Sequence, residues 1–208
     1  MYAEKSKICG LVLAAGLSTR FGNNKLLHNL SGKPVYSWVL DAVCNSLLTN
    51  IVFVCREELL PNLSSYPKIQ PVINHDPSAG QALSLRLGVN KLSKFASHIL
   101  ILLADQPLIT TSLINSFVTL TQNSQSLACL NTNNYLGPPA LFGKRWFKKL
   151  EECDGDTGAK KILMKEKNNL QLMPVQFQGQ EQDLDHCIDI EILENYAQKH
   201  SRLLENID

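Results

Sequence analysis

A short segment near the N-terminus combines small residues with two cationic side chains. An apolar run ends in Ala14-Ala15-Gly16, and a polar loop that carries Arg20 and Lys25 follows. A nucleoside triphosphate needs backbone N–H groups at close range and cations beside its crowded oxygens, and this segment supplies both. It therefore predicts a triphosphate-binding loop; the alternative is an ordinary strand-to-helix turn beside a solvated arginine and lysine. The glycine spacing matches neither the P-loop nor the dinucleotide fingerprint.

Asp105 is a second candidate for chemistry, because it follows an apolar run at residues 99–104 that predicts a buried central strand. A carboxylate at the end of such a strand suits Mg²⁺, which prefers oxygen ligands and commonly joins one or two carboxylates to substrate phosphates. The alternative is a helix cap or a turn before Pro107. Position alone leaves both interpretations open.

Two further segments carry weaker signals. Residues 75–81 predict entry into a helix whose first turns hold Ser84 and Arg86, where N–H groups and hydroxyls would suit an anion or a nucleoside. An ordinary helix start explains the same residues. Residues 154–158 form an acidic loop that does not match the EF-hand pattern. We interpret it as a helix cap, with a role in shaping an acceptor site as the alternative.

No constellation for covalent catalysis is present in the sequence. It has no G-x-S-x-G motif, its five histidines lack metal-ligand spacing, and its six cysteines form no C-x-x-C pair. The remaining chemistry is alignment and charge neutralisation, which suffices for phosphoryl-type transfer because the reactants bring their own nucleophile and leaving group.

The elements that must position these residues alternate between strand-like and helical periodicity, which predicts parallel βαβ units. Expected strands are residues 8–13, 51–55, 69–73, 98–103, 127–130 and 170–175. Expected helices start behind Pro34, near Ala82 and after Thr110 or Thr111, and span residues 144–152, 157–165 and 190–204. Residues 131–139 contain two consecutive prolines and should interrupt regular structure beside the site. Ligands of open parallel sheets bind beyond the carboxyl ends of the strands, where the candidate residues should meet.

Composition narrows the class of protein. A chain of 208 residues with 44% hydrophobic content suffices for one well-buried α/β domain, so we expect residues 1–208 to form a single domain. The net charge of +1 gives no broad footprint for nucleic acid or anionic membrane. The cysteines are interpreted as reduced core residues, no secretory signal is evident, and no apolar run approaches the roughly 20 residues of a membrane span. These features predict a cytoplasmic location.

With these residues in place, the chain resembles the MobA-like nucleotidyltransferases, which activate sugars, alditols or the molybdenum cofactor with a nucleotide. Residues 13–25 follow the family signature L-A-A-G-x-S-x-R-x-G-x-x-K, and residues 102–107 match its metal-binding strand end. The resemblance implies a three-layer αβα Rossmann-like fold of the nucleotide-diphospho-sugar transferase type, and catalytic roles for Arg20, Lys25 and Asp105. The nucleotide-binding residues that it implies are Leu13, Ala14, Ala15, Gly16, Ser18, Arg20, Lys25, Gly80 and Ser84.

Within this family, the branch that adds CMP to molybdopterin-bound molybdenum is the most similar. It has Ala-Ala-Gly where the guanylyl branch usually has Ala-Gly-Gly, so CTP is expected rather than GTP. Residues 75–85 echo its N-P-x-x-x-x-G-x-x-x-S-L stretch, and residues 155–159 echo its Gly-Asp-x-Gly-Ala segment. The family's G-H-P-V is replaced by residues 137–140, and its D-I-D-T-P-E-D is replaced by residues 189–195. Both departures lie on the implied acceptor side, to which we assign Gly137, Pro138, Asp156 and Glu191.

The resemblance implies transfer of CMP from CTP to a phosphorylated acceptor, molybdenum-bound molybdopterin, with release of pyrophosphate. Mg²⁺ would be held by Asp105 and by Asp189, with Glu191 as the alternative second ligand. A transient contact with a molybdoenzyme is expected, and none with nucleic acid or membrane. Two alternatives stay open: the same chemistry on a sugar or alditol phosphate, and a non-catalytic carrier of the nucleotide or pterin. The joint presence of Lys25 and Asp105 favours an enzyme.

Overall fold

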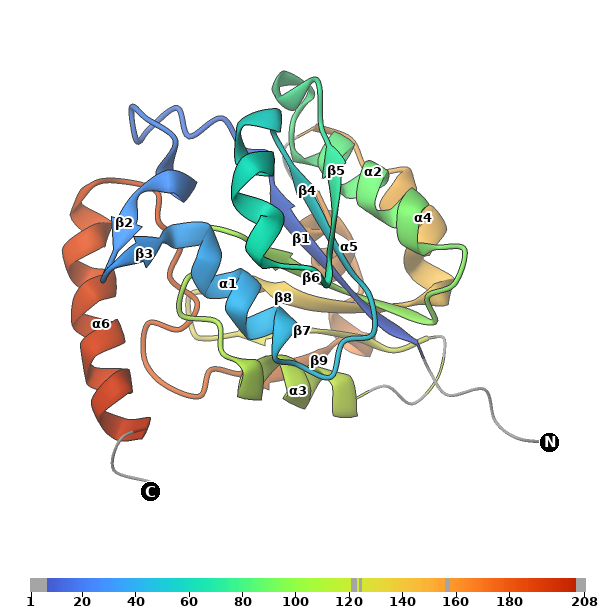
Figure 1. Ribbon diagram of the computed structural model, residues 1–208. Helices are drawn as coiled ribbons and strands as arrows, with labels where there is room; N and C mark the ends of the chain where they lie inside the picture. The colour runs from blue at the N-terminus through green and yellow to red at the C-terminus, as the bar shows by residue number, and fades with distance from the viewer. Residues whose placement is uncertain (1–6, 121–122, 124, 156–157, 205–208) are drawn as a thin grey trace.

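Seven strands form one sheet in the order β5-β4-β1-β6-β8-β7-β9, in a computed structural model that describes residues 7–120, 123, 125–155 and 158–204 (Figure 1). The strands are β1 (Ile8–Ala14), β4 (Ile51–Cys55), β5 (Ile69–Ile73), β6 (His98–Leu103), β7 (Leu127–Asn131), β8 (Leu136–Gly143) and β9 (Gln171–Pro174). All neighbouring pairs are parallel except those that β8 makes with β6 and β7. A separate hairpin joins β2 (Asn29–Leu30) to β3 (Lys33–Pro34). The predicted mostly parallel sheet is confirmed.

Helices cover both faces of this sheet. They are α1 (Val35–Cys44), α2 (Gln81–Leu92), α3 (Thr111–Thr119), α4 (Phe147–Glu151), α5 (Lys160–Lys165) and α6 (Ile188–Leu204), with short 3₁₀ segments that include η1 (Lys25–Leu27), η3 (Pro77–Ala79) and η4 (Lys144–Trp146). Thr110 is the N-cap of α3, as one of the two predicted choices: its side chain accepts the N–H of Leu113 at 3.2 Å. The helix predicted at residues 144–152 is divided between η4 and α4.

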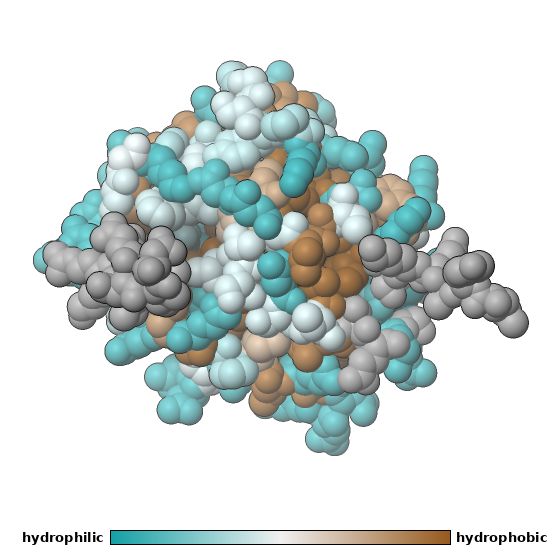
Figure 2. All heavy atoms as spheres, turned by 60° about the horizontal axis from the view of Figure 1, so that its bottom comes forward, coloured by the Kyte–Doolittle hydropathy of each residue, from teal (hydrophilic) through white to brown (hydrophobic). Residues whose placement is uncertain are grey.

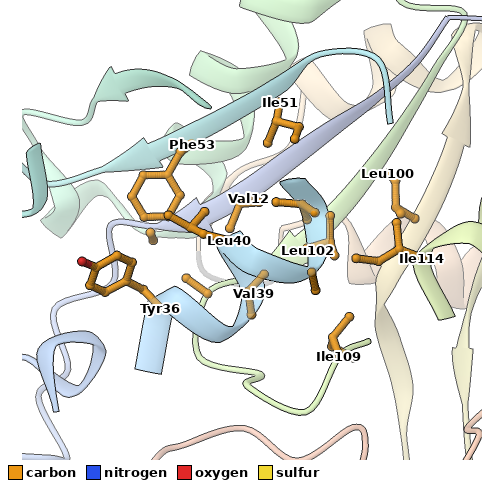
Figure 3. Packing of buried hydrophobic residues seen from close by; sticks show 14 of the residues in the cluster. Val12, Tyr36, Val39, Leu40, Ile51, Phe53, Leu100, Leu102, Ile109 and Ile114 are labelled. Atoms are coloured by element: carbon orange, nitrogen blue, oxygen red, sulfur yellow. The ribbon is translucent and has the colours of Figure 1, made fainter. Parts of the chain in front are cut away.

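The buried side chains form two clusters, one on each face of the sheet. Along β1, Val12 belongs to one cluster while Leu11 and Leu13 belong to the other, as the two-residue period of a strand requires. Figure 3 shows the first cluster, where Val12 and Phe53 lie beside Leu40 of α1. The second cluster includes buried residues of α2, α4 and α5. Helix, sheet and helix therefore form the three predicted layers.

Strand β8 departs from the prediction that residues 131–139 lack regular structure. It passes through Pro138 and Pro139, whose peptide bond is cis. Proline cannot donate a hydrogen bond to a neighbouring strand. The ladder tolerates both prolines because the register with β7 shifts there: Cys129 is paired with Ala140, whereas Leu130 is paired with Gly137. A sequence pattern of turn-forming residues therefore concealed a strand with an irregularity in the middle.

The thiols differ in their burial, and the surface is mixed in hydropathy. The face shown in Figure 2 is largely hydrophilic or of intermediate hydropathy, with hydrophobic residues gathered right of its centre and smaller hydrophobic groups elsewhere. None of the described helices is long and apolar enough to cross a membrane. All six cysteines are free; Cys9, Cys55 and Cys129 are buried as predicted, whereas Cys187 is exposed and therefore no core residue.

Candidate active site

The loop after β1 turns the chain so that Lys25 faces the carboxyl end of the sheet. Ser18 adopts a φ of 56° and Gly22 a φ of 83°, both in the left-handed region that permits tight reversals. The Ser18 hydroxyl accepts the N–H of Lys25 at 3.4 Å, and the Asn24 side chain accepts the N–H of Leu26 at 3.1 Å. These contacts fix the start of η1, and Lys25 is its first residue.

The ammonium of Lys25 lies between two carboxylates. Its Nζ is 2.6 Å from Oδ2 of Asp105 and 2.8 Å from Oδ1 of Asp185. The side chain of Lys25 is only 12% exposed, compared with 20% for Asp105 and 41% for Asp185. Arg20 approaches Asp185 from outside, with Nη1 3.4 Å from Oδ2 and 70% of its side chain exposed. The structure thus brings together the three residues predicted for catalysis and adds Asp185.

The electrostatic environment favours the charged forms of Lys25 and Asp185. Burial alone would lower the pKa of Lys25, but the charge of Asp105 and hydrogen bonds to Asp105 and Asp185 outweigh it, and the pKa is raised. The pKa of Asp185 is lowered, chiefly by the hydrogen bond from Lys25. The lysine is therefore a permanent cation at neutral pH, and its charge is available to an anionic ligand.

A cleft of about 370 Å³ opens beside these residues. Its walls come from three separate segments, the loop after β1, the start of α2 and the end of β6. The predicted site residues among its lining are Leu13, Ala15, Gly16, Ser18, Gly80, Ser84 and Asp105. A smaller hollow of about 160 Å³ shares Ser18 and Thr19 with the cleft and is lined also by Arg20, Lys25 and Asp185. Ala14 directs its side chain into the core cluster instead.

The start of α2 forms one wall of the cleft. Gly80 has a φ of 86° and enters the helix without a side-chain cap, so its first N–H groups lack intrahelical partners. Behind it, Asn74 donates its side-chain N–H to the Ser84 hydroxyl at 2.9 Å and accepts the N–H of Asp76 at 2.9 Å. Free amide groups beside a buried hydroxyl can receive a phosphate or the polar edge of a base.

A second carboxylate, Asp183, lies behind Asp105. The backbone N–H of Leu184 donates to the Asp105 carbonyl at 2.9 Å, which holds this segment against the end of β6. Burial raises the pKa of Asp183 to about 7, and repulsion from Asp105 adds to the effect. Its Oδ1 and the Oε1 of Gln106 are buried, and neither has a hydrogen-bond partner among the described residues. Two oxygen acceptors beside the site therefore have capacity for a cation or a donor.

The residues predicted for the acceptor side are dispersed. Gly137 and Pro138 lie behind Gln106: Gln106 donates to the Tyr135 hydroxyl at 2.9 Å, and that hydroxyl donates to the Pro138 carbonyl at 2.7 Å. A Cβ at Gly137 would come within 2.9 Å of the Tyr135 hydroxyl. Glu191 is exposed on α6. Asp156 lies outside the described residues.

Asp189, predicted as a metal ligand, caps the segment at the start of α6. Its Oδ2 accepts the backbone N–H groups of Asp185 and His186 at 2.9 and 2.7 Å, at the start of α6. This cap fixes the segment that presents Asp185 to Lys25. The aspartates of residues 183–189 have the same D-x-D-x-x-x-D spacing as the family pattern D-I-D-T-P-E-D, so this segment is a second candidate for that pattern.

The donor set fits a hard divalent cation. Among the described residues, no three acidic, His or Cys side chains are already arranged around a common metal position. Mg²⁺ does not require such a cage, because it usually takes one or two carboxylates and completes its shell with water and phosphate oxygens. Asp105 and Asp185 already flank the Lys25 ammonium, and Asp183 adds a buried carboxylate. Sequence reasoning missed Asp183 and Asp185, although their alternating spacing was a usable signal.

Comparison with known proteins adds independent information. A family model described as the MobA-like NTP transferase domain matches residues 10–170. The chain is 31% identical over 169 residues to purine catabolism protein PucB of Bacillus subtilis (strain 168), with 75% of this chain and 80% of that protein covered. It is 29% identical over 150 residues to a probable molybdenum cofactor guanylyltransferase of Pyrococcus horikoshii, with 69% and 73% covered. A solved Methanothermobacter nucleotidyl transferase shares the fold, with a TM-score of 0.82 at 18% identity over 94% of this chain and 100% of that one.

Proposed function

Because the chain belongs to the MobA-like NTP transferase family and is a nucleotidyltransferase, we propose that it transfers CMP from CTP to molybdenum-bound molybdopterin and releases pyrophosphate. The observation that carries this proposal is the cleft of about 370 Å³ that Asp105 lines, with Lys25 in ion-pair contact with Asp105 at 2.6 Å. A nucleoside fits between the loop after β1 and the start of α2, and its phosphates would extend toward the cations. The adjoining hollow at Arg20 supplies a second positive charge.

The chain's own residues have separable tasks in this reaction. Backbone N–H groups at Ala15 and Gly16, with those at the start of α2, would hold the nucleotide. Arg20 and Lys25 would neutralise the charge that develops toward the departing pyrophosphate. A phosphate oxygen of the acceptor attacks the α-phosphorus in line, a new oxygen–phosphorus bond forms, and the bond to the bridging oxygen breaks so that pyrophosphate leaves. No protein nucleophile is required.

A divalent cation, Mg²⁺ in our proposal, would be held by Asp105 together with Asp185 or Asp183. When bound, it supplies charge neutralisation on the phosphate oxygens. Asp185 takes the place that we assigned to Asp189, because Asp189 holds the backbone at the start of α6 and Asp185 directly contacts Lys25.

The preference for CTP rests on Ala15, which stands where the guanylyl branch usually has glycine. Its side chain is buried and lines the cleft, so it occupies space that glycine would leave for a larger base. Relatives named guanylyltransferases make GTP the competing nucleotide. If the Cβ of Ala15 selects the smaller base, Ala15→Gly should shift activity toward GTP.

The decisive experiment measures pyrophosphate release with Mg²⁺ and each of CTP, GTP, ATP and UTP, without an acceptor, with molybdenum-loaded molybdopterin, and with sugar or alditol phosphates. Release with CTP that requires the loaded cofactor is the expected result. Release with GTP would contradict the assigned base, and release with a sugar or alditol phosphate would contradict the assigned acceptor. CTP binding without release under every condition would favour the non-catalytic carrier. The proposal also places the protein in the cytoplasm, where a molybdoenzyme would receive the product.

A further inference from the structure

The positive charge between Asp105 and Asp185 is the ammonium group of Lys25. Lys25 reaches both carboxylates at ion-pair distance, 2.6 and 2.8 Å, from a side chain that is almost fully buried. These carboxylates are the groups that the proposed function assigns to the metal, and the inference below rests on that function. One position between two anions cannot hold an ammonium and a divalent cation at the same time.

We propose that Lys25 occupies the metal position in the nucleotide-free protein and excludes divalent cations until a triphosphate binds. Asp105 and Asp185 would repel each other without a cation between them, and Lys25 relieves this repulsion from within the fold. A free metal ion must therefore displace a well-placed internal competitor. The cost of that displacement weakens metal binding to the protein alone.

A triphosphate changes this competition because it offers Lys25 another anionic partner. The hollow of about 160 Å³ lies directly beside Lys25 and is lined also by Ser18, Thr19, Arg20 and Asp185. Phosphate oxygens in this hollow would draw the ammonium away from Asp105 and at the same time add ligands for the metal. Nucleotide and metal then bind cooperatively, and each strengthens the affinity for the other by the same factor.

Arg20 cannot take over the internal role of Lys25. It contacts Asp185 alone, at 3.4 Å, and 70% of its side chain is exposed, so solvent screens its charge. The competition with metal therefore depends on a single buried residue. A substitution of Lys25 should therefore strengthen metal binding even when no nucleotide is present.

The test measures Mn²⁺ affinity of the nucleotide-free protein by electron paramagnetic resonance and calorimetry. Lys25→Met should bind Mn²⁺ about tenfold more tightly than the wild type or better, within the usual range of coupling between sites. Lys25→Arg keeps a cation and should retain weak binding. Adding Asp105→Asn to Lys25→Met should abolish the gain. Lys33→Met is the matched control, because it removes a lysine that pairs with Asp41 elsewhere, and its affinity should equal that of the wild type.

Equal Mn²⁺ affinity in the wild type and Lys25→Met would overturn the inference, as would tight binding by the wild type alone. Lys25→Gln repeats the measurement with a polar side chain in case the methionine variant does not fold, as judged by circular dichroism. The readout contains no nucleotide or acceptor. Failure of CTP-dependent pyrophosphate release would therefore contradict the proposed function and leave the tightened Mn²⁺ binding of Lys25→Met unchanged.

Discussion

Lys25 and Asp105 form an ion pair of 2.6 Å because their segments follow two neighbouring parallel strands. Strands β1 and β6 end at the same edge of the sheet, so the loop after one strand and the turn after the other share one volume. The fold therefore converts two positions that are distant in sequence into one charged site. Asp185 reaches the same ammonium from a third segment.

Lys25→Ala is expected to lower turnover by about 100-fold or more, because removal of one preorganised charge at a reacting group costs that much. Folding should lose less than about 2 kcal/mol, since Asp105 and Asp185 are 20% and 41% exposed and water can solvate them once Lys25 is removed. Pyrophosphate release and urea denaturation measure the two effects. Activity equal to that of the wild type would exclude the assigned role of Lys25.

Asp105→Asn should lower turnover to a similar degree and raise the Mg²⁺ concentration required for half-maximal activity, because a neutral amide binds a hard cation weakly. A Mg²⁺ titration of the initial rate measures this shift. Asp41→Asn is the matched control: Asp41 also pairs with a lysine, Lys33, but outside the site. Its Mg²⁺ dependence should be that of the wild type, and a shift of equal size there would refute the specific role of Asp105.

The periodic parts of the fold were predictable from sequence. Buried parallel strands are continuous apolar runs, so residues 51–55 were placed with the observed bounds of β4. Residues 69–73 were also placed with the observed bounds of β5, an edge strand in which only Ile69 is buried. Strand β8 was not predictable in the same way, because its prolines resemble a loop until the register shift opposite them is known. Whether a proline is tolerated depends on the partner strand, which a local pattern does not contain.

The residues of the site also divide into those that the sequence predicts and those that it does not. Arg20 and Lys25 follow one predicted strand, and Asp105 follows another. Parallel strands end at the same edge of the sheet, so topology alone brings these residues together. Asp183 and Asp185 follow no such strand, and their approach depends on the Leu184 hydrogen bond to Asp105 and on the Asp189 cap. These contacts join segments that are distant in sequence, and the spacing of the aspartates is the one sequence feature that indicates them.

The raised pKa of Asp183 should make the stability of the folded protein depend on pH. Its pKa in the folded protein is about 7, above the ordinary value of 3.8, with burial as the main cause and repulsion from Asp105 as the next. The folded protein therefore retains a proton that the unfolded chain releases, and stability falls as pH rises from about 4 to 7. Asp183→Asn should remove this loss and stabilise the protein at pH 8 by about 1 to 3 kcal/mol, since one pKa unit corresponds to about 1.4 kcal/mol.

Urea denaturation at several values between pH 4 and pH 8 tests this dependence. Asp154→Asn is a suitable control: Asp154 is exposed, and the hydrogen bond from Lys161 lowers its pKa, so it titrates below this window. Its slope should match that of the wild type. An Asp183→Asn variant with the wild-type slope would show that Asp183 is charged in the folded protein at pH 5.

Gly88 allows α2 to approach β1 more closely than any other residue would. A Cβ at this position would lie 2.1 Å from Cδ1 of Leu11, which is fully buried. Gly88→Ala should therefore destabilise the protein by about 1 to 3 kcal/mol through overpacking, despite a gain in helix propensity of up to about 1 kcal/mol. Asn90→Ala, at an exposed position of the same helix, should preserve or raise stability.

A double-mutant cycle of Gly88→Ala with Leu11→Ala tests the close contact directly. The two substitutions together should cost less stability than the sum of their separate effects, because the smaller side chain at position 11 makes room for the added methyl group. Strict additivity would contradict the close contact.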